Sequence, residues 1–240
     1  LAELAEAEEA GAGDARIEGR IALTAPTLFG RRVVMPAVES FLEAHPAVGA
    51  RVLLLDRVVN LVEEGVDAAV RLAPLPDSGL VAVRLGEMRR LVCAAPDYLA
   101  RSGAPATPGD LDRHACLGTE DGLAREIWHF SDGASDRRRP LSRTVGPRIA
   151  LNSAGAAIDA AVRGGGLCRV MAYQVVEPLA AGHLVPLLRG FEPAPVPVHL
   201  VFHPIPRRNR ALRAFVDHAV PRLRAALTDL SERIARFDGA

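Results

Sequence analysis

The sequence contains no lysine: all 29 basic residues are arginines, and 29 acidic residues bring the formal net charge to zero. A chain without lysine cannot form a Schiff base, a Walker-type phosphate loop or a lysine general base. The balanced charge also argues against tight non-specific binding of nucleic acid by this polypeptide alone, because such binding needs an excess of cations.

Cysteine is scarce as well, with Cys93, Cys116 and Cys168 far apart in the sequence. An odd number without close spacing supports neither a disulfide framework nor a zinc ribbon, and it favours a reducing compartment such as the cytoplasm. No run approaches about 18 uncharged apolar residues, so we expect no membrane span and no membrane partner.

Residues 1–10 carry acidic side chains where an export signal needs a basic and then an apolar run. We interpret them as the end of a solvated helix that enters a flexible joint at residues 11–13. The chain is therefore expected to be a fragment whose upstream part is absent. With 240 residues, 49 % of them hydrophobic and 24 % charged, it has an ordinary globular composition and room for one large domain or two small ones.

From Arg20 onward, short β-rich runs alternate with helix-like runs. A helix is predicted from Phe29 to Leu42, with Pro36 as a misfit that only a first turn or a kink tolerates, and a second helix is predicted between the N-cap Asp56 and Gly65. Strands are predicted at residues 21–25, 51–55, 67–72, 80–85 and 90–94. This order implies a parallel sheet with right-handed crossovers.

A second α/β unit follows, and we expect two lobes joined by two crossings near Arg89 and Leu188. A short helix is predicted at Pro96, a capped turn at residues 107–111 and a polar hairpin or loop at 131–140. Asn152-Ser153 can cap a helix that ends at Gly164-Gly165-Gly166. Further strands are predicted at residues 115–118, 126–130, 144–151, 167–171, 184–188 and 198–202, and further helices at 154–163, 175–179 and 210–227.

The sequence gives little support for a catalytic site or a metal site. His199 and His203 are four apart, which suits zinc on a helix, but their run reads as a strand and separates the rings by roughly 13 Å. No G-x-S-x-G elbow occurs, Cys93 lies in an apolar strand, and no histidine stands near Cys168 in the sequence. The three glycines follow a helix, so they do not fit a dinucleotide motif. We predict no metal, no cofactor and no enzyme.

A binding site is better supported. Thr24, Ala25 and Thr27 lie at the carboxyl end of the first strand and just before a helix, where hydroxyls and free backbone N–H groups favour an anion. Asn152-Ser153 repeats the arrangement in the second lobe. Two such ends facing each other would form a cleft for a small, anionic molecule.

Arg71 and Thr119, also at predicted strand ends, are further candidates. Each of these residues alone also fits a cap or a solvated loop, and only their pairing favours binding. The basic clusters at residues 31–32, 137–139 and 207–208 can meet phosphates, but acidic residues balance them overall, and the sequence favours a solvated face.

Several stretches resemble the effector-binding domain of LysR-type transcriptional regulators. They are GRIALTAPTLFGR at residues 19–31, DRVVNLVEEGVDAAVR at 56–71, LPDSGL at 75–80, CAAPDYL at 93–99 with Gly103 and Pro105, and LAAGHLVPLL at 179–188. The likeness runs in order from about Gly19 to Leu227.

The resemblance implies two Rossmann-like α/β lobes with crossover strands, like type 2 periplasmic binding proteins, and an effector pocket between the lobes. It implies lobe I at residues 19–90 and 190–228, lobe II at 91–189, a linker tail at 1–18 and a C-terminal tail at 229–240. It also implies DNA binding through a missing N-terminal winged helix-turn-helix, and self-association as a dimer or tetramer. The pocket residues would be Thr24, Ala25, Thr27, Arg71, Thr119 and Ser153.

The chain departs from the family at Cys168-Arg169, where the family usually has a small apolar residue. An arginine there can select a carboxylate through a bidentate pair, or it can point to solvent. The leading interpretation is an effector-binding and oligomerisation domain that senses a small, anionic metabolite in the cytoplasm. An exported solute-binding protein of the same architecture is the alternative.

Overall fold

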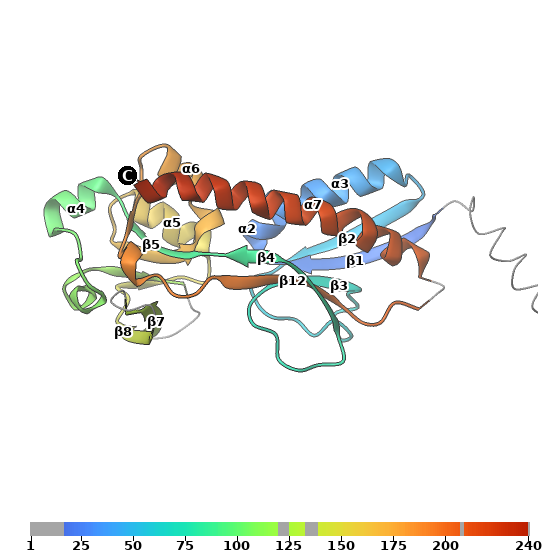
Figure 1. The fold of residues 1–240 in the computed structure, drawn as a ribbon, viewed down its shortest axis with the longest axis horizontal. Helices are drawn as coiled ribbons and strands as arrows, with labels where there is room; N and C mark the ends of the chain where they lie inside the picture. Colours follow the sequence, from blue (N-terminus) through green and yellow to red (C-terminus); the bar gives the residue numbers. More distant parts are fainter. Residues whose placement is uncertain (1–16, 120–124, 133–138, 207–208, 240) are drawn as a thin grey trace, which may run out of the picture. The chain divides into compact units, whose positions relative to one another are not determined.

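The computed structural model describes residues 17–119, 125–132, 139–206 and 209–239. They form two compact units (Figure 1). The first comprises the described residues of Leu1–Arg71, Asp77–Val83 and Leu200–Leu223, and the second those of Leu72–Pro76, Arg84–His199 and Arg224–Ala240. The lobe boundaries expected from the sequence stay a prediction, and the predicted helix at residues 1–10 lies outside the described residues.

One five-stranded sheet has the order β2-β1-β3-β12-β4. Its strands are β1 (Gly19–Ala25), β2 (Val48–Leu54), β3 (Ala68–Leu72), β4 (Val81–Met88) and β12 (Val196–Phe202). β1 runs parallel to both β2 and β3, with Gly19 opposite Val48 and Leu23 opposite Ala68. The predicted parallel pairing of the first three strands is therefore confirmed.

The chain after β1 is helical from Thr27 to Ala44, as α2 (Thr27–Phe29), the π-helical η1 (Gly30–Val34) and α3 (Met35–Ala44). The π-helical turn ends two residues before Pro36, whose missing N–H removes one i→i−4 hydrogen bond. The predicted helix is confirmed, and so is its irregularity at Pro36. Phe41 of α3 packs edge-on against Phe215, with ring centroids 5.4 Å apart.

The helix predicted between Asp56 and Gly65 is wrong, because this segment forms turns. Asn60 Oδ1 accepts a hydrogen bond from the Val62 N–H at 3.0 Å, a local bond that competes with a helix. Asp56 Oδ1 accepts one from the Thr27 N–H at 2.9 Å, so it caps the helix that begins at Thr27 instead of one of its own. Val59 and Leu61 are buried while Val58 and Val62 are 78 % and 70 % exposed, and this i, i+2 spacing of buried residues does not fit one face of a helix.

A second five-stranded sheet has the order β11-β5-β10-β6-β9. Its strands are β5 (Arg90–Ala94), β6 (Cys116–Gly118), β9 (Ile149–Ala150), β10 (Leu167–Met171) and β11 (Val185–Leu187). β10 is antiparallel to β5 and parallel to β6, and β6 is parallel to β9. The chain passes from the first sheet to the second at Arg89 and returns between β11 and β12.

A separate antiparallel pair joins β7 (Glu126–Ser131) to β8 (Pro140–Val145). Part of the hairpin or loop predicted at residues 131–140 lies outside the described residues. The single strand predicted at residues 144–151 is wrong, because β8 ends at Val145 and β9 begins at Ile149. Pro147 lies between them and has no N–H for a ladder bond, and the next N–H, from Arg148, donates to the Cys116 carbonyl at 2.9 Å.

Short helices cover the second unit: α4 (Pro96–Ser102), η2 (Pro108–Arg113), α5 (Ala154–Val162), η3 (Ala172–Gln174), α6 (Val176–Ala180) and η4 (Arg189–Phe191). The predicted cap of η2 is confirmed: Asp110 Oδ2 accepts from the Thr107 N–H at 2.8 Å, and this hydrogen bonding holds the Asp110 pKa below its ordinary value. α5 ends as predicted at the three glycines, where Gly164 and Gly166 have φ of 76° and 147°.

The last helix, α7 (Arg210–Ala235), is followed by the 3-10 turn η5 (Arg236–Gly239). α7 extends past the predicted end at Leu227. Its residues up to Leu223 belong to the first unit, and those from Arg224 belong to the second.

Candidate functional site

The candidate residues of the first unit gather at the carboxyl end of its parallel strands. β1 ends at Ala25, which lies opposite Leu54 in β2. Thr24 lies opposite Ala69 in β3, and Arg71 follows Ala69 by two residues in the same strand. The structure therefore brings Thr24, Ala25, Thr27 and Arg71 to one edge of the sheet, where open α/β sheets bind ligands.

Several donors at this edge already have partners within the unit. The buried Thr24 hydroxyl donates to the Leu53 carbonyl at 2.9 Å, and Arg71 Nη2 donates to the Val59 carbonyl at 3.0 Å. The expectation of a free N–H at Thr27 is wrong, because Asp56 accepts its hydrogen bond. Asp56 comes from the loop after β2, a contact that local sequence did not indicate.

The candidate residues of the second unit gather in the same way. Gly118 at the end of β6 lies opposite Ala150 at the end of β9, and the Leu151 N–H donates to the Gly118 carbonyl at 3.1 Å. Thr119 and Asn152 thus follow neighbouring strand ends. Arg169 of β10 lies one residue beyond the Cys168–Leu117 pair, level with Gly118.

Ser153 is the predicted helix cap, and this role is confirmed. Its Oγ accepts a hydrogen bond from the Ala156 N–H at 3.3 Å at the start of α5. Asn152 is exposed beside it, whereas Ser153 is half-buried.

Arg169 does not point to solvent, so that alternative is wrong. The residue is 8 % exposed, its Cζ lies 5.7 Å from the centre of the Trp128 ring, and its Nη2 donates to the Ile127 carbonyl at 3.2 Å. These contacts fix its guanidinium against β7 through a cation–π contact and a hydrogen bond.

The sequence interpretation missed Glu126, a buried acid that connects these groups. One carboxylate oxygen, Oε1, accepts from the Thr119 N–H at 2.5 Å, and Oε2 accepts from Trp128 Nε1 at 3.0 Å. A Cβ on Gly118 would lie 2.5 Å from Glu126 Oε1, so the close approach of the carboxylate requires glycine there. The signal was the alternation of the predicted strand, which puts Glu126 on the same face as Trp128 and Phe130.

The chain is similar to known proteins of one family. The family model described as the LysR substrate binding domain matches residues 14–224. The chain belongs to this LysR family. It is 29 % identical over 230 residues to a probable HTH-type transcriptional regulator, LtrA, of Klebsiella pneumoniae, covering 92 % of this chain and 72 % of the relative. A regulator of Xanthomonas campestris is 32 % identical over 229 residues, with 92 % and 64 % covered.

Solved structures of LysR regulators share the fold. The LysR-type regulator CrgA of Neisseria meningitidis matches with a TM-score of 0.75 at 27 % identity, covering 92 % of this chain and 74 % of that protein. Its regulatory domain alone matches with a TM-score of 0.71 at 26 % identity, covering 86 % and 100 %. The two-lobe fold like that of periplasmic binding proteins is thereby confirmed.

The relatives are transcriptional regulators and not enzymes, as the sequence predicts. They also favour the regulator over the exported solute-binding protein. Among the described residues, no helix has both the length and the apolar character needed to cross a bilayer.

The three cysteines of this LysR domain lie in the core of the second unit, all buried and free. Burial raises the pKa of Cys116 and of Cys168 to about 12 and raises that of Cys93 well above its ordinary value. The thiols are therefore protonated at neutral pH and unsuited to nucleophilic attack.

The described histidines and arginines of the sequence patterns show neither a metal site nor a phosphate site. His199 lies in β12, as predicted, and the described part of the chain holds no group of three or more His, Cys, Asp or Glu that fits a metal ion. Arg31 and Arg32 are exposed on η1, which fits a solvated face. Residues 137–138 and 207–208 of the other clusters lie outside the described residues.

Proposed function

We propose that this LysR domain binds a small, anionic metabolite as its effector through residues at the carboxyl ends of its parallel strands. The observation that carries the proposal is that each unit gathers its candidate residues at one such end. These residues are Thr24, Ala25, Thr27 and Arg71 in the first unit, and Thr119, Asn152, Ser153 and Arg169 in the second.

Two arginines support an anionic effector: Arg71 lies near the end of β3, and Arg169 lies in the middle of β10, level with the end of β6. Arg71 is half-buried and Arg169 is buried, and each is held by a hydrogen bond to a main-chain carbonyl. A guanidinium that is partly removed from water and fixed in orientation attracts a carboxylate more strongly than a solvated one does. The proposed effector therefore carries a carboxylate or a similar planar anionic group.

Replacing Thr27 or Ser153 with alanine is expected to weaken effector binding about tenfold, the loss of one hydrogen bond to a charged group. The effector is first selected as the small carboxylic acid that raises the melting temperature most, and its affinity is then measured by isothermal titration calorimetry. Thr27→Ala keeps the backbone N–H that donates a hydrogen bond to Asp56. Ser153→Ala removes the side-chain cap of α5 and should lower the free energy of unfolding by about 1 kcal/mol.

Ser142→Ala is the matched control, because Ser142 lies on the exposed face of β8 and contacts His129. Its affinity should equal that of the wild type. An unchanged affinity in both the Thr27 and the Ser153 variant would refute the pocket assignment.

We further propose that effector binding shifts the regulator between two states, and that DNA is bound by a winged helix-turn-helix upstream of this chain. For such coupling, the effector must bind the two states with different affinities. The regulator would then act in the cytoplasm, where the DNA is. The relatives named above, described as HTH-type regulators, support this assignment.

The domain is also proposed to self-associate as a dimer or tetramer. Sedimentation velocity should give a particle of about twice the mass of one chain or more, in an equilibrium that shifts with concentration. A monomer at every concentration would contradict this proposal.

A further inference from the structure

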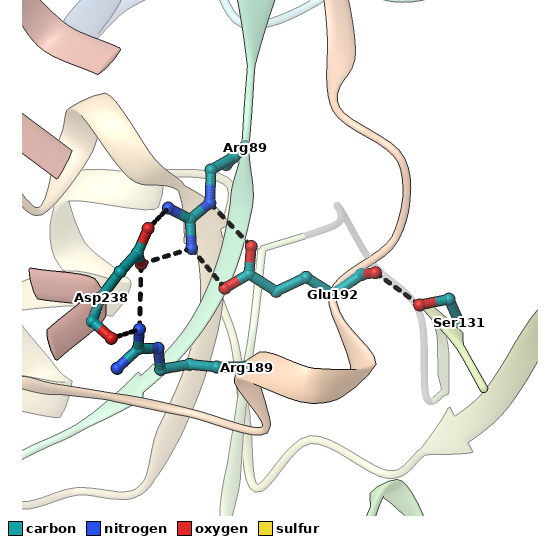
Figure 2. Close-up of polar contacts among 5 residues, drawn as sticks. All are labelled: Arg89, Ser131, Arg189, Glu192 and Asp238. Atoms are coloured by element: carbon teal, nitrogen blue, oxygen red, sulfur yellow. Dashed lines mark hydrogen bonds and ion pairs between the residues drawn. The ribbon is translucent and has the colours of Figure 1, made fainter. Parts of the chain in front are cut away.

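Arg89 is the centre of a cluster of charged residues that we call the C-terminal clasp, formed by Arg89, Arg189, Glu192 and Asp238 (Figure 2). All four belong to the second unit. They come from three places in the sequence: Arg89 lies between β4 and β5, Arg189 and Glu192 lie at η4, and Asp238 lies in the last turn η5.

The guanidinium of Arg89 binds two carboxylates at once. Nε and Nη2 each donate to a Glu192 oxygen at 2.8 Å, while Nη1 and Nη2 donate to the Asp238 oxygens at 2.8 and 2.9 Å. Both contacts are bidentate, the geometry that makes arginine–carboxylate pairs strong and directional. The two carboxylates raise the pKa of Arg89, so it stays charged at every accessible pH.

Two further contacts extend the clasp. Arg189 Nη2 donates to the Asp238 main-chain oxygen and lies 3.2 Å from its carboxylate. On the other side, the buried Ser131 hydroxyl donates to the Glu192 carbonyl at 2.6 Å, which links the clasp to β7 (Figure 2).

The Arg89–Glu192 part of the clasp is shielded from water, whereas the side chain of Asp238 is 42 % exposed. The side chains of Arg89 and Glu192 are only 28 % and 11 % exposed, against 61 % and 54 % for the Arg84–Glu87 pair on β4. Exposed pairs contribute little, whereas removing one partner from a shielded pair is costly.

The backbone beside the clasp is also constrained. Leu188 has a φ of 54°, the only positive value of a non-glycine residue in the described part of the chain. Its side chain is buried in the core of the second unit, and η4 follows it directly with Arg189. A left-handed leucine persists only where its surroundings hold it.

Three of the segments by which the second unit continues into the first lie close to the clasp residues in the sequence, and the other two boundaries flank residues 72–76. β4 crosses between Val83 and Arg84, β12 between His199 and Leu200, and α7 between Leu223 and Arg224. α7 is attached to β4 a second time, because Arg224 Nε and Nη2 donate to the Arg84 carbonyl at 3.1 and 2.9 Å.

We propose that the C-terminal turn η5 acts as a strap: the ion pairs of Asp238 with Arg89 and Arg189 hold the ends of the three connecting segments together within the second unit. The strap thus sets how firmly these segments are anchored. Its removal should loosen them without unfolding the sheet, because no sheet residue other than Ser131 contributes to the clasp.

Hydrogen–deuterium exchange of Asp238→Ala in the full chain tests the strap. The informative amides are those of Phe191 and Glu192, which donate to Leu188 and Arg189, and that of Ala172, which donates to the Arg89 carbonyl. We expect them to exchange about tenfold faster than in the wild type, since local opening is governed by local contacts. Amides of the β1–β2 pair should be unchanged.

Glu87→Gln is the matched control, because it removes the negative charge from the exposed Arg84–Glu87 pair on β4 and should leave all these rates unchanged. Arg189→Met, which spares the Arg89–Asp238 pair, should accelerate exchange less than Asp238→Ala. Rates at residues 172, 191 and 192 within about twofold of wild type in Asp238→Ala would overturn the proposal. Equal acceleration of all amides would overturn it too, because that would mean global destabilisation.

Discussion

Replacing Gly166 with alanine is expected to lower the melting temperature by about 10 °C. Gly166 has a φ of 147°, and a Cβ there would lie 2.2 Å from the Ala115 carbonyl oxygen. That oxygen accepts the Leu167 N–H at 2.8 Å, the bond that continues β10 alongside β6. Because the obstacle is backbone, relief requires breaking this pairing, and we expect a loss of about 4 kcal/mol.

Gly182→Ala separates the two causes of that loss, which are the strain of a positive φ and the clash of the added Cβ with the backbone of Ala115. Gly182 also has a positive φ, of 70°, but nothing lies within 4 Å of its added Cβ. The control should therefore cost only about 1 kcal/mol, from backbone strain alone. Equal melting temperatures for the two variants, followed by circular dichroism, would show that the close approach at Ala115 is unimportant.

Replacing Trp128 with alanine is expected to cost about 3–5 kcal/mol, because Trp128 is the largest fully buried side chain of the second unit. Its ring packs under Arg169, and its indole N–H donates to Glu126. Trp128→Phe keeps an aromatic ring beside Arg169 but removes the N–H, so it should cost an intermediate amount of about 2 kcal/mol.

Urea unfolding followed by circular dichroism measures both variants, since neither retains a tryptophan. A Phe variant as stable as the wild type would mean that the Trp128–Glu126 hydrogen bond contributes nothing. A Phe variant as unstable as the Ala variant would mean that the hydrogen bond, and not the ring, accounts for the effect.

Regular elements could be predicted from the sequence because their signals are local. β5 and β10 have the predicted bounds, and Ser153 caps the predicted helix. The helix predicted at Asp56 does not form, because the Asp56 carboxylate accepts the hydrogen bond of the Thr27 N–H, 29 residues away in the chain, and does not cap its own segment. No local pattern reveals that choice.

The placement of the candidate residues at strand ends was predictable in part for the same reason. Strand ends followed by Thr, Ser or Asn mark the edge of a parallel sheet, and the structure gathers these residues there. Glu126 and the C-terminal clasp were not predicted. Arg89 meets Glu192 and Asp238 across separations of 103 and 149 residues, and a single sequence carries no sign of such pairs.

Trp128, the only tryptophan, lies beside Arg169, so its fluorescence reports directly on the proposed effector site. The decisive measurement is a fluorescence titration of the wild-type chain with small carboxylic acids and with their uncharged amides of the same shape. For at least one acid we expect a saturable change in Trp128 emission, with an affinity at least about tenfold tighter than that of its amide. No saturable change with any acid, or equal affinity for acid and amide, would contradict a domain that senses an anionic metabolite.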